Sequence, residues 1–314
     1  MAALSDLLTR QLHFVCGKGG VGKSVVSCAL ARSFHDSGKS VLLVQVNAAD
    51  SHARLLDTAP VTAELREIER GFTVVNVTPA AAMKEYALLT LRFEALYRTV
   101  FENRLTKAFL RFLPSLPELT MQGKIWHHAE EREEGRPRFQ RIVVDCPSTG
   151  HGLKFLRVAR VVADASRVGP MAEKTRRMHA VIEDERRTAL HVVALPEELP
   201  VNEARELVEQ VRVQKTAPLG AVFLNQRLPR LFDVASERAL DALRASNDAH
   251  DRHALAQLLH VADRRRSREQ LESNMRARLE SLLLPLIELP MLLAAPPGPR
   301  DIERFAALVQ QESG

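Results

Sequence analysis

A glycine-rich segment near the N-terminus has the residue types needed to bind a chain of phosphates. It reads Gly17-Lys18-Gly19-Gly20-Val21-Gly22-Lys23-Ser24. An apolar run over 12–16 precedes it and a helical pattern over 24–36 follows it, which is the order of strand, loop and helix that a phosphate-binding loop requires. The glycines let successive backbone N–H groups turn towards phosphate oxygens, and the positive end of the helix dipole adds to their field.

Two side chains of this loop are expected to contact the ligand directly. Lys23 is placed to contact the β- and γ-phosphates of a nucleotide, and the Ser24 hydroxyl is the expected ligand of Mg²⁺. The rest of the predicted nucleotide-binding loop is formed by Gly19, Gly20, Val21 and Gly22. The sequence therefore predicts that the chain binds ATP together with magnesium.

A second segment places an acidic residue directly after an apolar run. It reads Ile142-Val143-Val144-Asp145-Cys146-Pro147-Ser148-Thr149-Gly150-His151-Gly152-Leu153. A carboxylate at a strand end can hold a magnesium ion through water, so Asp145 is predicted to contact the metal along with Ser24. The turn that follows can change shape when a neighbouring γ-phosphate leaves, and its predicted members are Pro147, Thr149, Gly150 and His151.

Both segments resemble one class of dimeric ATPases. A G-K-G-G-V-G-K-[ST] loop is the deviant form found in septum-site and partition proteins, nitrogenase iron protein and arsenite-pump-type ATPases. The stretch 145–151 is similar to the second switch, D-[TA]-[AP]-P-T-G-H, of the arsenite-pump (ArsA) and tail-anchored-protein-targeting ATPase family. The resemblance implies ATP hydrolysis in a dimer, with Lys18 as a catalytic residue that crosses the interface to the partner's nucleotide.

The resemblance covers most of the chain. Segments 112–126 and 195–203 are also similar to bacterial members of this family. Asn225, after the predicted strand 219–224, matches the family's adenine-reading asparagine, whose amide can donate to one base nitrogen and accept from another; an ordinary strand-end turn is the alternative. Nitrogenase iron protein fits less well because a second suitably placed cysteine is missing. Septum-site proteins fit less well because 301–314 interleaves acidic residues with its apolar ones.

The chain departs from this family after the predicted strand 41–46. The family's first switch begins D-P-A-H, and its aspartate activates the attacking water. This chain instead reads Gln45-Val46-Asn47-Ala48-Ala49-Asp50-Ser51-His52. An ungapped comparison puts Asn47 at the catalytic position, where an amide is a poor proton acceptor and the missing group is typically worth about 10² to 10⁴ in rate. A local shift that lets Asp50 take this role is the alternative.

Apolar runs of strand length alternate with helical stretches, which predicts an α/β P-loop NTPase fold with a mainly parallel sheet covered by helices on both faces. The expected strands are 12–16, 41–46, 72–77, 141–145, 190–195, 219–224 and 285–289. A helical insertion is expected over 80–130, between the third and fourth strands, and further helices over 231–282 and 300–311. A polar connection is expected over 130–138. We expect one domain over 1–314.

Composition excludes several classes of protein and partner. The 314 residues are 46% hydrophobic and 26% charged, with no apolar run near the ~20 residues of a membrane span and no secretory pattern, so a cytoplasmic globular chain is expected. Three scattered cysteines form no C-x-x-C pair, so no zinc-linked dimer is expected. The net charge of +5 is spread among many acids, and apart from the arginines of 264–268 there is no basic cluster that would suggest nucleic acid.

Three functions are compatible with these observations. The first is a dimeric ArsA-like ATPase, a homodimer or a heterodimer with a paralogue, whose nucleotide state opens and closes the subunits and whose hydrolysis is slowed by Asn47. The second is a nucleotide-binding regulatory subunit that is paired with an active paralogue. The third is a carrier of hydrophobic protein segments, in which the apolar residues of 80–130 form a client groove instead of core or dimer contacts.

Overall fold

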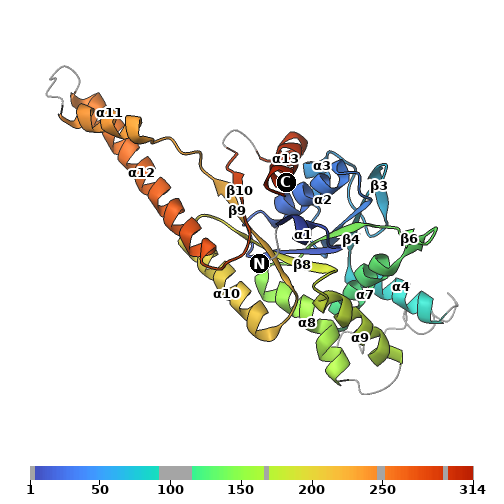
Figure 1. The fold of residues 1–314 in the computed structure, drawn as a ribbon. Helices are drawn as coiled ribbons and strands as arrows, with labels where there is room; N and C mark the ends of the chain where they lie inside the picture. Colours follow the sequence, from blue (N-terminus) through green and yellow to red (C-terminus); the bar gives the residue numbers. More distant parts are fainter. Residues whose placement is uncertain (1–3, 92–114, 166–169, 246–251, 293–295, 314) are drawn as a thin grey trace.

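The computed structural model describes residues 4–91, 115–165, 170–245, 252–292 and 296–313. The chain forms an eight-stranded sheet between two layers of helices (Figure 1). Its strands are β1 (Leu12–Gly17), β2 (Val41–Val46), β3 (Arg66–Glu69), β4 (Phe72–Val77), β7 (Arg141–Asp145), β8 (Thr188–Ala194), β9 (Leu219–Arg227) and β10 (Leu286–Pro290). Their order is β10-β9-β8-β1-β7-β2-β4-β3, and every pair is parallel except β3 with β4.

This architecture confirms the predicted α/β P-loop NTPase fold. Each predicted strand corresponds in order to an observed one, with small differences at the ends. Every residue of β1, β2 and β8 is buried, as expected for strands covered on both faces. The continuous apolar runs in the sequence therefore arise because both faces of each strand contact helices.

Three short strands are absent from the prediction. They are β3 and the two members of a small antiparallel hairpin, β5 (Arg132–Glu133) and β6 (Arg136–Pro137). The hairpin lies in the stretch expected to be a polar connection, and its residues are exposed. Since β3, β5 and β6 bury little apolar surface, they lack the periodic pattern from which strands are recognised.

Two apolar cores lie between the sheet and the helices, one on each face of the sheet. One face packs against α1 (Leu4–Leu8), α2 (Lys23–Asp36), α3 (His52–Leu56) and α13 (Pro299–Ser313). The opposite face packs against α4 (Pro79–Leu91), α7 (Leu116–Glu130), α8 (Thr149–Ala165), α9 (Pro170–Glu183), α10 (Glu198–Gln214) and the end of α12 (Arg252–Glu280). Alternate residues of β1 supply the two cores: Phe14 faces the second layer, and Val15 faces the first.

The predicted helical insertion over 80–130 is represented by α4 and α7, which pack against each other. Ala82 of α4 joins Met121 and Ile125 of α7 in the core against the sheet. Residues 92–114, in the middle of the predicted insertion, lie outside the described residues. Helices α4 and α7, the two described parts of the predicted insertion, therefore cover part of one face of the sheet.

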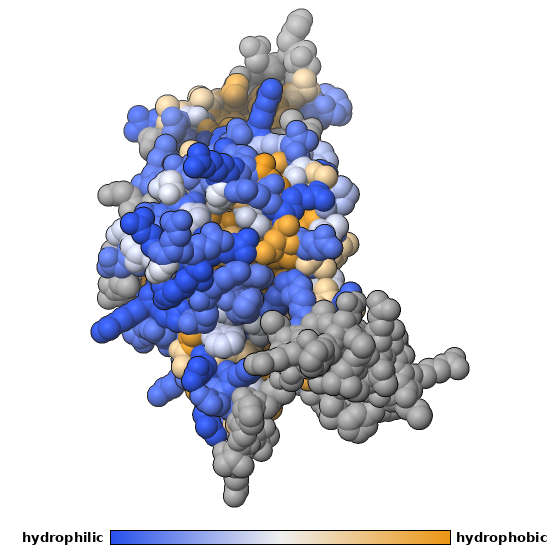
Figure 2. Space-filling view, turned by 90° about the vertical axis from the view of Figure 1, so that its right-hand side faces the viewer, coloured by the Kyte–Doolittle hydropathy of each residue, from blue (hydrophilic) through white to orange (hydrophobic). Residues whose placement is uncertain are grey.

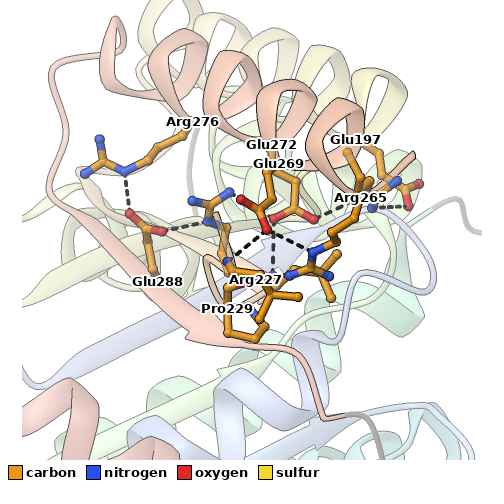
Figure 3. Close-up of polar contacts among 11 residues, drawn as sticks. Glu197, Arg227, Pro229, Arg265, Glu269, Glu272, Arg276 and Glu288 are labelled. Carbon is orange, nitrogen blue, oxygen red and sulfur yellow. Dashed lines mark hydrogen bonds and ion pairs between the residues drawn. The ribbon is translucent and has the colours of Figure 1, made fainter. Parts of the chain in front are cut away.

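Helices α11 (Val234–Ala245) and α12 form an arm that projects from the body of the molecule (Figure 1). The base of the arm is tied to β9 by charged side chains (Figure 3). Glu272 of α12 accepts hydrogen bonds from Arg227 Nη1 at 3.0 Å and from the Leu228 backbone N–H at 3.2 Å, and Arg227 Nε donates to Glu288 of β10 at 2.7 Å. Because Glu272 is almost completely buried, these donors replace the water that its carboxylate loses.

Apolar side chains are scattered over the surface seen in Figure 2. Hydrophilic residues predominate on this face, and hydrophobic ones form small patches among them. In the part of the chain that the structure describes, no helix combines the length and the apolar composition needed to cross a bilayer. The large apolar residues of the described elements lie mainly in the two cores.

A buried pair of histidines links β1 to β8. His13 Nε2 lies 2.8 Å from the Arg10 carbonyl oxygen, His13 Nδ1 lies 3.0 Å from His191 Nε2, and His191 Nδ1 lies 3.0 Å from the Ala221 backbone N–H. A carbonyl only accepts and an N–H only donates, so this chain of contacts is satisfied by two neutral rings. Burial lowers the pKa of both histidines, that of His191 to about 3.

We expect the free energy of unfolding to fall as the pH decreases from 7 to 6. The unfolded chain binds protons on these histidines below about pH 6.5 while the folded chain does not, so protonation favours the unfolded state there. The two groups together account for about 1 kcal/mol over this interval. Denaturant unfolding at both pH values measures the effect. A His13→Gln, His191→Gln double variant should show a weaker pH dependence, and an unchanged dependence would contradict the assignment.

Candidate functional site

The glycine-rich loop connects the carboxyl end of β1 to the start of α2. The carboxyl ends of β2, β7 and β9 meet at the same edge of the sheet because these strands are parallel to β1 or linked to it through parallel neighbours. The chain leaves β1 towards β2 on one side, while β8 and β9 lie on the other. In open α/β sheets a ligand binds outside the carboxyl ends of the strands at such a reversal of strand order.

Several glycines of the loop are required by its backbone path. Gly20 and Gly22 have φ values of +86° and +90°, in the left-handed region that favours glycine. A Cβ atom on Gly22 would lie 2.2 Å from Asn225 Nδ2, and one on Gly17 would lie 2.6 Å from the Val193 carbonyl oxygen. The loop therefore passes too close to β8 and β9 for side chains at these two positions.

The two predicted metal-contacting residues are brought together. Ser24 Oγ, at the start of α2, donates a hydrogen bond to Asp145 Oδ2, at the end of β7, over 2.6 Å. Asp145 is largely buried, and a hydroxyl that donates to a carboxylate makes one of the stronger hydrogen bonds in proteins. Next to this pair, Lys23 Nζ folds back over the loop and donates to the Lys18 carbonyl oxygen at 2.8 Å.

His52 is a member of the site that the sequence patterns did not assign. It is the first residue of α3, and its Nε2 lies 3.1 Å from Asp145 Oδ2. The ring is completely buried. The sequence shows His52 within the first switch, but no local spacing indicates that a short helix after β2 turns this side chain towards the end of β7.

The two candidates for the water-activating residue have different surroundings. Asn47 directly follows β2, its φ is +45°, its backbone N–H donates to the Val77 carbonyl oxygen at 2.9 Å, and the residue is exposed. Asp50 instead uses both carboxylate oxygens within its own loop. Its Oδ1 accepts from the Ala53 N–H at 3.0 Å and its Oδ2 from the Val61 N–H at 2.8 Å.

Asn225 lies behind the loop. Its Nδ2 donates to the Val21 carbonyl oxygen at 2.9 Å, its Oδ1 accepts from the Gln226 N–H at 2.9 Å, and its residue is only 3% exposed. In this structure the predicted adenine-reading amide therefore supports the loop through Val21. Strand β9 continues to Arg227, so Asn225 lies within its strand and not directly after it as predicted.

Lys18 points to a residue of its own chain. Its ammonium forms an ion pair with Glu203 of α10, and half of the Lys18 side chain is exposed. Exposed ion pairs contribute about 0 to 1 kcal/mol, so such a contact is readily exchanged. The sequence patterns did not single out Glu203, because a partner carried by a distant helix has no local signal.

The predicted second switch follows Asp145 and begins α8. The first turn of this helix contains Thr149, Gly150 and His151. Pro147 precedes them, and Ser148 comes close to the glycine-rich loop, since a Cβ atom on Gly19 would lie 4.0 Å from Ser148 Cβ. The glycine-rich loop and the segment that leads into α8 are therefore neighbours in the structure.

The described residues are suited to a metal ion that is held partly by the phosphates of a bound ligand. They contain no group of three or more His, Cys, Asp or Glu side chains gathered around a point. The three cysteines are free and buried, and burial raises the pKa of the Cys28 and Cys146 thiols. Magnesium prefers oxygen ligands and usually keeps waters and substrate phosphates around one or two protein groups. The Ser24 hydroxyl beside the Asp145 carboxylate offers such a set.

Comparison with known proteins places the chain in a family. Residues 10–168 match the sequence profile of the anion-transporting ATPases. Over 301 residues the chain is 30% identical to ATPase BagA of Mycobacterium tuberculosis, covering 89% of this chain and 87% of that protein. The chain belongs to the anion-transporting ATPase family. The predicted resemblance to the arsenite-pump (ArsA) ATPase family is thereby confirmed.

Other members of the family match over shorter stretches. The arsenical pump-driving ATPase of Escherichia coli is 28% identical over 273 residues, covering 78% of this chain but 43% of that protein. ATPase GET3 of Kluyveromyces lactis is 26% identical over 192 residues, covering 54% of each chain. This anion-transporting ATPase family member therefore spans less than half of the arsenical pump-driving ATPase.

Proposed function

We propose that this member of the anion-transporting ATPase family binds ATP with magnesium at the glycine-rich loop and acts in a dimer whose subunits open and close with nucleotide state. The observation that supports this most strongly is the 2.6 Å contact of Ser24 with Asp145. It joins the start of the helix after the loop to the end of the neighbouring strand. A hydroxyl and a carboxylate in this arrangement are the protein groups that a nucleotide-bound magnesium ion needs.

In this proposal the chain's own groups bind and orient the phosphates. The Lys23 ammonium leaves the Lys18 carbonyl oxygen and contacts the β- and γ-phosphates instead. The backbone N–H groups of the loop, in which Gly20 and Gly22 are left-handed, turn towards phosphate oxygens. Ser24 contacts the metal directly and Asp145 contacts it through water. A bound magnesium ion would neutralise part of the charge that develops on the phosphates during transfer.

We further propose that hydrolysis is slow. Asn47 occupies the position after β2 at which the first switch of the resembled family has its aspartate. An amide is a poor proton acceptor and cannot take a proton from water at useful rates. Asp50 is poorly suited to replace it, since both of its carboxylate oxygens accept backbone hydrogen bonds at 3.0 and 2.8 Å. This supports a second candidate function, a nucleotide-binding regulatory subunit that is paired with an active paralogue.

The carrier function receives less support from the described residues. They form an apolar pocket of about 140 Å³ between α7 and α9 that includes Leu119, Trp126 and Met178. Residues 92–114, which make up much of the proposed groove, lie outside the described residues.

The dimer proposal predicts a specific effect of Lys18→Ala. Because the Lys18 side chain forms no hydrogen bond or ion pair other than that with Glu203 within the described part of the chain, the variant should fold and bind ATP almost normally. If Lys18 acts across an interface, the same variant should associate several times more weakly in the presence of ATP and magnesium. Light scattering measures association and calorimetry measures binding.

Lys215→Ala, at an exposed lysine after α10, is the matched control and should behave like the wild type. The dimer proposal fails if the wild-type chain associates neither with itself nor with a paralogue when ATP and magnesium are present. It also fails if Lys18→Ala weakens association no more than Lys215→Ala does.

A further inference from the structure

The Asp145 carboxylate has two side-chain neighbours on the same oxygen. Ser24 Oγ lies 2.6 Å and His52 Nε2 lies 3.1 Å from Asp145 Oδ2. Within the described residues no hydrogen bond reaches the other oxygen, Oδ1. The rotation of the carboxylate is therefore fixed from one side, while its second oxygen is left for another ligand.

The chemistry of the contact determines which nitrogen of His52 carries a proton. An ionised carboxylate only accepts hydrogen bonds, so Nε2 is the donor. On the far side of the ring, Nδ1 is buried and has no hydrogen-bond partner in the described structure. An unpaired buried polar atom costs about 1 to 3 kcal/mol, so an apolar side chain of similar size would pack there at lower cost. The unpaired Nδ1 therefore makes histidine less favourable at this buried position than an apolar side chain of similar size.

The helix that carries His52 is held independently of Asp145. The Asp50 carboxylate accepts hydrogen bonds from the Ala53 N–H in the first turn of α3 and from the Val61 N–H in the segment after α3. Leu55 is buried in the core that α3 shares with α2 and α13. The ring is therefore presented to Asp145 by a fixed element, which is the arrangement expected of a group that orients another.

We propose that His52 is a positioning residue that holds the Asp145 carboxylate in the rotation required for magnesium. This inference rests on the proposed binding of ATP with magnesium. Among the described residues the His52 ring has a hydrogen-bond partner only at Nε2, which contacts Asp145, so in this proposal it acts through Asp145. Its contact also joins the first switch to the second, because α3 begins five residues after Asn47 and Asp145 precedes the segment that leads to α8.

The test compares two substitutions that remove or keep the donor. His52→Leu removes it and keeps the site filled, whereas His52→Gln can place an amide N–H near the position of Nε2. With a fluorescent ATP analogue at fixed concentration, MgCl₂ is titrated to find the concentration for half-maximal binding. We expect His52→Leu to raise this concentration at least fivefold and His52→Gln to stay within twofold of the wild type.

Two further measurements separate positioning from packing. Affinity for the analogue in EDTA should be the same within twofold in all three proteins, since His52 does not contact the phosphates. The thermal midpoint of His52→Leu should stay close to that of the wild type, because removal of the unpaired Nδ1 offsets the lost hydrogen bond to Asp145. His191→Gln, at a buried histidine of β8, is the control and should leave the magnesium titration unchanged.

The outcomes distinguish this inference from the function on which it rests. A loss in His52→Leu that is restored in His52→Gln supports it. It is overturned if His52→Leu needs no more magnesium than the wild type, or if both variants lose magnesium response and stability together. If the wild type binds the analogue without any response to magnesium, the proposed function fails first, and the role of His52 fails with it.

Discussion

Asn47→Asp should raise the rate of ATP hydrolysis by about 10² over the wild type. The substitution restores a carboxylate at the same length in the position after β2, where it can accept a proton from the attacking water. Asn47 has a φ of +45°, and aspartate tolerates the left-handed region nearly as well as asparagine, so the backbone should not resist the change. Phosphate release under saturating ATP and magnesium measures the rate.

Asp50→Asn is the comparison that tests the alternative. If Asp50 activates water, this variant should abolish turnover and Asn47→Asp should change little. Since Asp50 caps α3 and holds Val61, we expect instead a modest loss of stability of about 1 kcal/mol with little effect on the slow basal rate. Rapid hydrolysis by the wild type that survives Asp50→Asn would contradict both assignments and would show that another group positions the water.

The parts of the molecule that were predicted from sequence share one physical property. The buried strands appear as continuous apolar runs because helices cover both faces, and the loop at 17–24 is recognised by its glycines, of which Gly20 and Gly22 adopt the left-handed conformation. Both signals are local, since each depends on residues adjacent in the chain. For this reason the seven predicted strands, the mainly parallel sheet and the position of the loop between β1 and α2 were correct.

The parts that were missed depend on contacts between distant segments. His52 is 93 residues from Asp145 and Lys18 is 185 residues from Glu203, and neither pair has a spacing that marks it in the sequence. Asn225 was predicted to read adenine, and the contact of its amide with Val21, 204 residues away, likewise has no signal in the sequence. Such contacts exist only once parallel strands have brought their carboxyl ends to one edge.

The site contains one group that neighbouring side chains hold in place and two that are held by contacts a ligand can replace. Asp145 is fixed by Ser24 and His52, whereas the two loop lysines are held by contacts that a nucleotide can replace, a backbone carbonyl for Lys23 and Glu203 for Lys18. Preorganised groups lose little entropy when a ligand binds, and exchangeable ones release their partners at small cost. Nucleotide binding is therefore expected to move the lysines while the carboxylate stays in place.

Lys23→Ala should weaken ATP binding at least tenfold, which corresponds to about 1.4 kcal/mol. The β- and γ-phosphates lose their main side-chain counter-ion, while the loop N–H groups and the helix N-terminus remain. In the described structure the Lys23 ammonium donates only to the Lys18 carbonyl oxygen, so its removal should leave the thermal midpoint nearly unchanged. Calorimetry on Lys23→Ala, with Lys215→Ala as control, measures the affinity. Equal affinity of Lys23→Ala and the wild type would contradict the assignment of the glycine-rich loop as the ATP site.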